Sequence, residues 1–396
     1  MNSQSGFPSV EAKLLTGGRV YGPDDQGLQD LLIAGGRIIA MHPNLGTAEW
    51  LGAEKVDCTG LSIVPGLVDS HLHIIGGGGN EGYSTRIPEL WPGELLGAGI
   101  TTAVGTPGID MITKGPEAIL AKAYALGEDG IATYMYVGGF QLPIRTITGT
   151  IVRDLYLVEK VIGVKLALGE RRASAIPTAW LVELARELEW CAGSTGKACL
   201  LHAHLGDLAQ PGRQLLETID KSSASVERFQ ATHCNNTEDT LDAAVLLGRE
   251  GCAVDCNPLL DPARGLERCV PFRDAVARLL DKGVPLDLIT MSSDANASVP
   301  PFIGASRAPF DKYLATLWEG VVTLVHSDVL PLSEALTLCT SNVARILRLD
   351  GAKGVIRVGA DADLLVIDEQ LKIKDVYAGG RRSVIDGVAA ISGIYE

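Results

Sequence analysis

The sequence has no long apolar run, no basic cluster and few aromatic residues. Phe, Trp and Tyr make up 5% of its 396 residues, and Gly, Arg or Lys interrupts each apolar stretch well before the roughly 18 residues of a membrane span. The chain carries 34 basic and 48 acidic residues, a net charge of −14, which disfavours a surface for phosphate groups. We therefore expect neither a membrane nor a nucleic acid as a partner.

The sequence also lacks paired cysteines and a secretory leader. Its eight cysteines form no C-x-x-C motif, and Cys252 and Cys256 lie four apart on what is predicted to be a strand, which argues against a zinc finger. The first 13 residues show no basic segment followed by an apolar one, so we expect a cytoplasmic protein. With 46% hydrophobic and 21% charged residues, the chain can bury a large core.

The middle of the chain alternates short β-branched apolar runs with segments of helical period. This rhythm is typical of βαβ units around a parallel sheet. Four helices are predicted at 117–126, 178–190, 237–250 and 271–281, where apolar residues recur at spacings of three and four. Eight strands are predicted, as a (β/α)₈ barrel of the TIM type requires: 63–73, 100–105, 132–139, 161–168, 198–206, 228–235, 251–258 and 286–296.

The two ends of the chain read differently from its middle. Both contain short alternating strands separated by Gly-rich turns, with little helical period. Neither end has enough strands to cover an apolar face alone, so we pair them. The sequence thus predicts an α/β fold in which residues 1–62 plus 350–396 form a small accessory β-sandwich and residues 63–349 form the barrel.

Histidines gather where the predicted barrel strands end. Of seven histidines, five lie at or near these carboxyl ends, which form the rim that carries the active sites of barrel enzymes. The pair in His71-Leu72-His73 faces one side of its strand and can chelate one ion. His204, His233 and Asp294 end three further strands. Each alone could be an ordinary buried polar residue, but together they predict a metal centre.

A lysine in an apolar strand is a candidate to join two metal ions. Lys165 lies within Val161-Ile162-Gly163-Val164-Lys165-Leu166, where burial would lower its pKa. A neutral amine there can take up CO₂ and become a carbamate, an anionic ligand with two oxygens. The alternative is a lysine whose amine reaches the rim.

The ordered set of motifs resembles the amidohydrolase superfamily, and within it the isoaspartyl dipeptidase family. The resemblance covers nearly the whole chain. It rests on these segments: PGLVDSHLH at 65–73, GGGG at 76–79, RTITG at 145–149, VIGVK at 161–165, HLGD at 204–207, THCN at 232–235, SSD at 292–294 and GADADL at 359–364.

The resemblance implies a binuclear zinc centre. His71, His73 and Asp294 would hold one zinc ion, His204 and His233 the other, and carboxylated Lys165 would bridge the two. A hydroxide bridging the ions would attack an amide carbonyl, with Asp294 as the catalytic base that passes its proton to the leaving amine. Because HLGD matches the family at His204, we place His202 deeper in the barrel, although the two assignments could be reversed.

The resemblance also suggests contacts to the substrate. Arg172 matches an arginine that clamps the substrate carboxylate, and Ser298 matches a serine that contacts the substrate. Gly78, within the GGGG run, is taken as a further substrate-binding residue.

The sequence departs from the family at four substrate positions. Phe140 replaces a tyrosine that polarises the scissile carbonyl, and Asn236 replaces an arginine. A glutamate that binds the substrate amino group falls on Asn80, with Glu81 one residue later, and a threonine falls on Ile109. Gln141 and Tyr83 are candidates to replace the missing donor. These changes favour a substrate with fewer charges.

The sequence therefore predicts a binuclear zinc amidohydrolase that hydrolyses a β-aspartyl dipeptide or a related small amide. One alternative is a hydrolase of a cyclic amide or an N-acyl amino acid, and a remote one is a non-catalytic assembly scaffold. The family resemblance also implies a homo-oligomer.

Overall fold

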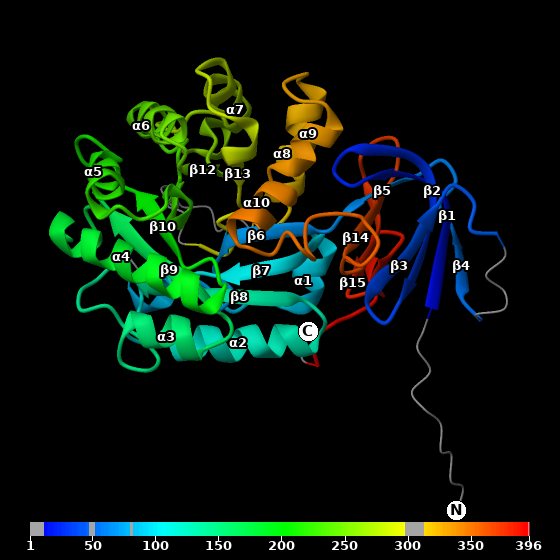
Figure 1. Ribbon diagram of the computed structural model, residues 1–396, viewed down its shortest axis with the longest axis horizontal. Helices are drawn as coiled ribbons and strands as arrows, with labels where there is room; N and C mark the ends of the chain where they lie inside the picture. The colour runs from blue at the N-terminus through cyan, green and yellow to red at the C-terminus, as the bar shows by residue number, and fades with distance from the viewer. Residues whose placement is uncertain (1–11, 47–51, 80–81, 298–312, 395) are drawn as a thin grey trace, which may run out of the picture.

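A computed structural model describes residues 12–46, 52–79, 82–297, 313–394 and 396 of the protein. A barrel and an accessory β-sheet lie side by side (Figure 1). The barrel sheet has eight strands, each hydrogen-bonded in parallel to the next along the chain. These are β6 (Leu67–Leu72), β7 (Ile100–Gly105), β8 (Ala132–Gly139), β9 (Val161–Leu168), β10 (Leu200–Leu205), β11 (Phe229–Thr232), β12 (Ala253–Cys256) and β13 (Ile289–Met291).

Helices follow the barrel strands and cover the outside of the barrel (Figure 1). The four predicted helices are confirmed as α2, α4, α6 and α7, and Thr237 caps α6 by accepting a hydrogen bond from the N–H of Thr240. The α-helices are α1 (Pro92–Gly97), α2 (Pro116–Glu128), α3 (Ile151–Leu157), α4 (Thr178–Thr195), α5 (Arg213–Ser222), α6 (Glu238–Arg249), α7 (Phe272–Asp281), α8 (Thr316–His326), α9 (Leu332–Thr337) and α10 (Ser341–Ile346). None of the described helices is both long and apolar enough to cross a membrane.

The two chain ends combine into the accessory unit, as expected. Hydrogen bonds join its strands into one mixed nine-stranded sheet, in which N-terminal β5 pairs with C-terminal β14. Leu15, Ile33, Ile63 and Tyr377 belong to its own buried core. Its strands are β1 (Ala12–Tyr21), β2 (Asp25–Ala34), β3 (Arg37–His42), β4 (Glu54–Asp57), β5 (Ser62–Pro65), β14 (Leu364–Ile367), β15 (Ile373–Ala378), β16 (Arg381–Ile385) and β17 (Val388–Ala389).

Five of the predicted barrel strands were too long: β10, β11 and β12 are shorter at both ends than predicted, and the first and last strands differ for structural reasons. The strand predicted at 63–73 is two strands, because the chain leaves the accessory sheet after β5 and enters the barrel at β6, with Gly66 between them. A Cβ on Gly66 would meet the Thr101 hydroxyl at 2.3 Å, so the crossing requires glycine. The strand predicted at 286–296 is reduced to β13, because residues 286–288 form a 3₁₀ turn and Asp294 has a positive φ.

A buried ion pair lies where the chain returns from the barrel to the accessory sheet. Lys353 Nζ lies 2.6 Å from Asp363 Oδ2 and 2.9 Å from Asp361 Oδ2. The other Asp363 oxygen accepts the backbone N–H of Gly379, and the Asp363 carbonyl accepts that of Gly66. Lys353 therefore compensates a carboxylate whose own segment contacts both units.

We expect Lys353→Met to lower the free energy of unfolding by about 3 kcal/mol, because it leaves the buried Asp363 carboxylate without its partner. Chemical denaturation measures the loss. Lys282→Met is the control, since Lys282 is exposed and its ion pair within the described residues is with its neighbour Asp281 at 3.7 Å. Adding Asp363→Asn to Lys353→Met should restore part of the loss. Equal stability of Lys353→Met and wild type would contradict this role.

Candidate active site

The closing seam of the barrel brings the first predicted ligands together. Leu72, the last residue of β6, forms a parallel β-bridge with Ala295, which lies four residues after the end of β13. The N–H of Asp294 donates to the His71 carbonyl at 3.0 Å, and the N–H of His73 donates to the Ala295 carbonyl at 2.9 Å. Two segments more than 200 residues apart in the sequence are therefore held in register at the rim.

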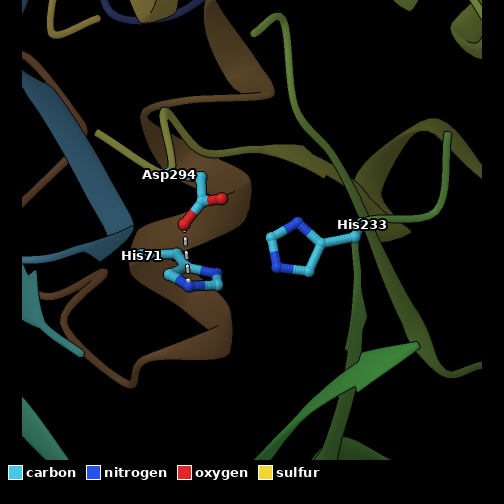
Figure 2. A group of neighbouring side chains, drawn as sticks. All are labelled: His71, His233 and Asp294. Carbon is cyan, nitrogen blue, oxygen red and sulfur yellow. Dashed lines mark ion pairs between the residues drawn. The ribbon is translucent and has the colours of Figure 1, made fainter. Parts of the chain in front are cut away.

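Two imidazoles and a carboxylate converge at this seam. Figure 2 shows His71, His233 and Asp294, whose potential ligand atoms all lie within 4.8 Å of one another. The Nε2 atoms of His71 and His73 each lie 3.3 Å from Asp294 Oδ1. This is the clustering that the spacing of the strand ends predicted.

Lys165 and His204 complete the group from neighbouring strands. Lys165, on β9, places its Nζ 2.8 Å from His71 Nε2, and the ring of His204, on β10, lies 4.5 Å from that of His233. Gly138 at the end of β8 allows the close approach to β9, because a Cβ there would meet the Lys165 carbonyl at 2.2 Å. All six predicted ligands therefore surround one cavity.

Burial sets the protonation of these groups. It lowers the pKa of Lys165 to about 7 and that of His233 to about 3, and it holds the pKa of His71 well below its usual range. Burial alone would raise the pKa of Asp294, but the imidazoles and Lys165 outweigh it and lower this pKa to about 2. Near pH 7 the cavity thus presents neutral imidazoles at His71 and His233, an ionised carboxylate at Asp294 and a partly neutral amine at Lys165.

Two of the ligand candidates have strained backbones. His233 has φ +63° and Asp294 has φ +49°, in the left-handed region that non-glycine residues rarely adopt. Such a conformation costs of order 1 kcal/mol or more and persists where the surrounding structure enforces it. Here it turns both side chains toward the cavity where the strands end.

The donor set fits a divalent cation. Neutral imidazole nitrogens and a carboxylate oxygen are the ligands that Zn²⁺ takes from proteins. The Nδ1 atom of His73 is buried without a hydrogen-bond partner, although its Nε2 faces Asp294. His71, His73, His204, His233 and Asp294 could therefore hold metal, with Lys165 between them.

The sequence analysis missed Glu170, which supports this cavity. Its side chain is 8% exposed, and its Oε2 lies 3.2 Å from His204 Nε2. Because Nε2 faces this carboxylate, Nδ1 is the ring nitrogen of His204 that remains available to bind an ion. The same carboxylate accepts hydrogen bonds from Arg172 Nε at 2.9 Å and Nη2 at 3.2 Å. Burial opposes its ionisation, but hydrogen bonds from His204 and Arg172 lower the pKa of Glu170. The sequence feature that could have identified Glu170 is its position, two residues after the end of barrel strand β9.

The predicted substrate residues divide into three groups. Arg172, Phe140 and Ile109 line the cavity, and the Phe140 ring lies edge-on to His204 at 5.5 Å. Gly78 and Asn236 do not line it. Gly78 has φ +83° and no room for a Cβ beside the Thr85 carbonyl, whereas Asn236 accepts a hydrogen bond from Cys269. Asn80, Glu81 and Ser298 lie outside the described residues.

The donors considered as replacements for the missing tyrosine do not reach the cavity. Tyr83 is 89% exposed and Gln141 is exposed, and neither contributes to the cavity wall. His202, which was placed deeper in the barrel, is fully buried with its Nε2 3.0 Å from His71 Nδ1.

The fold is similar to that of a solved β-aspartyl dipeptidase from the thermophilic, keratin-degrading Fervidobacterium islandicum AW-1, in complex with β-Asp-Leu dipeptide. The two proteins are 30% identical and superpose with a TM-score of 0.87 over 97% of this chain and 99% of that one. The sequence model of the Amidohydrolase family matches residues 203–389. This chain belongs to the isoaspartyl dipeptidase family of the amidohydrolase superfamily. It is a hydrolase that acts on carbon–nitrogen bonds, which confirms the prediction of an enzyme.

Other relatives match a part of this chain, most of it at lower identity, or its fold alone. An N-acyl-D-aspartate deacylase from Alcaligenes xylosoxydans xylosoxydans is 37% identical over 110 residues, which is 28% of this chain and 19% of that protein, so the match spans about a fifth of this relative. An imidazolonepropionase from Salinispora arenicola is 26% identical over 381 residues, covering 85% and 87% of the two chains. A dihydropyrimidinase from Brevibacillus agri, 14% identical with a TM-score of 0.68 over 96% of each chain, shares the fold.

We expect Glu170→Gln to weaken the affinity for Zn²⁺ about tenfold to hundredfold, because His204 loses the carboxylate that orients its ring. Competition with a chromogenic chelator measures the affinity. The matched control is Glu183→Gln, since Glu183 is 67% exposed and forms a surface ion pair with Arg186. An unchanged affinity would show that Glu170 does not orient this histidine.

Proposed function

We propose that this protein is a binuclear zinc amidohydrolase that hydrolyses a β-aspartyl dipeptide or a related small amide. The observation that carries the proposal is the convergence of four imidazoles, Lys165 and Asp294 on one cavity that Arg172 also lines. The β-Asp-Leu dipeptide bound to the Fervidobacterium relative supports the substrate class. A cytoplasmic location and a homo-oligomeric state remain predictions.

Lys165 is suited to become the carbamate that bridges the metal ions. Its pKa of about 7, lowered by burial, leaves a substantial share of neutral amine near neutral pH. The nitrogen lone pair of this amine attacks CO₂, a proton leaves, and the product carries one negative charge on two oxygens. In this proposal His71, His73 and Asp294 hold one ion, and His204 and His233 hold the other.

The side chains of this cavity have separate tasks in amide hydrolysis. Bound divalent ions supply Lewis acidity and lower the pKa of water. Asp294, ionised at neutral pH, accepts the proton of the attacking water and returns it to the leaving amine. The Arg172 guanidinium, held by Glu170, faces the substrate carboxylate, and a planar fork of N–H donors suits that group. Phe140 and Ile109 form an apolar wall that excludes water.

That apolar wall favours a second candidate, a hydrolase of N-acyl amino acids or cyclic amides. Phe140 is 8% exposed and offers no hydroxyl to a scissile carbonyl, and Ile109 adds a second apolar side chain. The partial match to an N-acyl-D-aspartate deacylase is consistent with an acylated substrate amine. Values of kcat/KM for purified enzyme on β-aspartyl dipeptides, N-acyl aspartates and hydantoins decide between the candidates. No turnover of any of them by zinc-loaded protein would refute both.

We expect Lys165→Ala to reduce bound zinc from two ions per chain to one or fewer. We also expect kcat/KM to fall about a thousandfold or more, which corresponds to roughly 4 kcal/mol of transition-state stabilisation. Elemental analysis and a dipeptidase assay measure the two effects. Lys221→Ala, at an exposed lysine on α5, should change neither. Full zinc content together with full turnover in Lys165→Ala would overturn the proposed centre.

We expect Phe140→Tyr to raise kcat/KM for β-Asp-Leu about tenfold to hundredfold, because the new hydroxyl can donate a hydrogen bond to the developing oxyanion. Phe140→Leu is the control, since it remains apolar and should give no rise. Steady-state kinetics compare the variants. If the two substitutions have equal effects, the missing hydroxyl is not what limits dipeptide hydrolysis.

A further inference from the structure

A buried carboxylate outside the ligand set lies beneath the metal-ligand candidates. Asp255, on β12, is fully buried and accepts hydrogen bonds from three hydroxyl groups. Thr290 Oγ1 donates to its Oδ1 at 3.0 Å, and Thr232 Oγ1 and Ser292 Oγ donate to its Oδ2 at 2.7 and 2.6 Å. Because each hydroxyl has one hydrogen, all three oxygens can only accept from their remaining neighbours.

The first chain of hydrogen bonds runs from Thr290 to His71. Since Thr290 Oγ1 accepts, Gln230 turns its Nε2 toward it at 3.0 Å and its Oε1 toward His202 Nδ1 at 2.8 Å. The proton of His202 therefore lies on Nδ1, and its Nε2 accepts from His71 Nδ1 at 3.0 Å. Tyr136 stacks on the His202 ring at 5.0 Å and keeps it in this plane.

The Thr232 hydroxyl supports the same assignment for His71. Its oxygen lies 3.4 Å from His71 Nδ1 and can only accept, because its hydrogen is donated to Asp255. Lys165 Nζ lies 3.5 Å from Nδ1, farther than the 2.8 Å that separates it from Nε2. His202 and Thr232 therefore both favour a proton on Nδ1. His71 Nε2 then carries the lone pair and faces Lys165 Nζ at 2.8 Å and Asp294 Oδ1 at 3.3 Å.

The second chain runs from Ser292 to His233. Ser292 Oγ accepts from Asn257 Nδ2 at 2.9 Å, and the Ser292 carbonyl accepts from the same nitrogen at 3.0 Å. The amide is thereby oriented with its Oδ1 2.6 Å from His233 Nδ1. That nitrogen carries the proton, so His233 Nε2 is the atom with a free lone pair.

We propose that Asp255 is a positioning residue that fixes the tautomers of two metal ligands, acting on His71 through Thr290, Gln230 and His202, and on His233 through Ser292 and Asn257. This inference rests on the metal centre proposed above. Both chains lead to the same result, because each leaves an Nε2 lone pair pointing into the cavity. Burial raises the pKa of Asp255 to about 6, so it remains largely ionised at neutral pH.

The first experiment reads the tautomers directly in metal-free protein. Long-range ¹⁵N–¹H spectra of ¹⁵N-histidine-labelled enzyme, assigned with His71→Gln and His233→Gln, distinguish protonated Nδ1 from protonated Nε2. We expect Nδ1–H for both His71 and His233. Nε2–H at either residue would overturn the proposal, whatever the activity of the enzyme.

A pair of variants at Gln230 tests whether the hydrogen-bond chain from Thr290 to His71 sets the tautomer of His71. Gln230→Glu keeps an acceptor facing His202 Nδ1, whereas Gln230→Met removes it at similar size. We expect Gln230→Met to lose the uniform Nδ1–H form of His71 and to weaken Zn²⁺ affinity about tenfold to hundredfold. Gln230→Glu should keep both within a few-fold of wild type. Gln214→Met, at a glutamine on α5 whose amide bonds to Ile176 and Thr178, controls for loss of a part-buried amide.

The results separate this inference from the proposed function. Unchanged Zn²⁺ affinity and His71 tautomer in Gln230→Met would refute the inference while leaving the metal hydrolase intact. If wild-type protein binds no Zn²⁺, the proposed function fails. The tautomers of His71 and His233 in metal-free protein still test whether the two hydrogen-bond chains from Asp255 set them. Asp255→Ala should disturb both histidines, and the Gln230 variants remain informative if Asp255→Ala does not fold.

Discussion

The structure depends on how the barrel closes between its first and last strands. Hydrogen bonds from the Asp294 N–H to the His71 carbonyl, and from the His73 N–H to the Ala295 carbonyl, form this seam. They fix the main chain on both sides of the cavity before any side chain contributes. Positive φ at Asp294 then turns its carboxylate toward the Nε2 atoms of both histidines. The hydrogen bonds that close the barrel therefore also position the candidate ligands.

The histidines and Lys165 of the cavity are shielded from water, and hydrogen bonds hold the histidine rings in place. Desolvation lowers the pKa values of the buried imidazoles and of Lys165, which produces nitrogen lone pairs at neutral pH. Two carboxylates outside the predicted ligand set then orient the rings. Glu170 contacts His204 and Arg172 directly, and Asp255 reaches His71 and His233 through neutral side chains. The metal site and the candidate substrate clamp share a support in Glu170.

The sequence predicted the bounds of three barrel strands and made the other five too long. Strands β7, β8 and β9 have the predicted bounds, because in each case an apolar-rich run ends at a glycine or is followed directly by one. It predicted poorly where a run serves two sheets, as at Gly66, since apolar periodicity does not show which partner a strand takes. Glu170, Asp255, Gln230 and Asn257 were missed for a related reason. Their roles depend on hydrogen-bond partners 23 to 60 residues away, apart from the local pair of Glu170 with Arg172.

The sequence alone determined the fold class and the two-part architecture, because apolar periodicity and turn residues are local features of the chain. It also named six candidate ligands, and the folded chain brings these to one cavity. The tertiary structure decided which atoms of those residues face one another. The proton on an imidazole depends on the neighbours of both ring nitrogens, and these neighbours come from β6, β9, β10, β11 and the segments after β12 and β13. Only the folded barrel brings them within hydrogen-bonding distance.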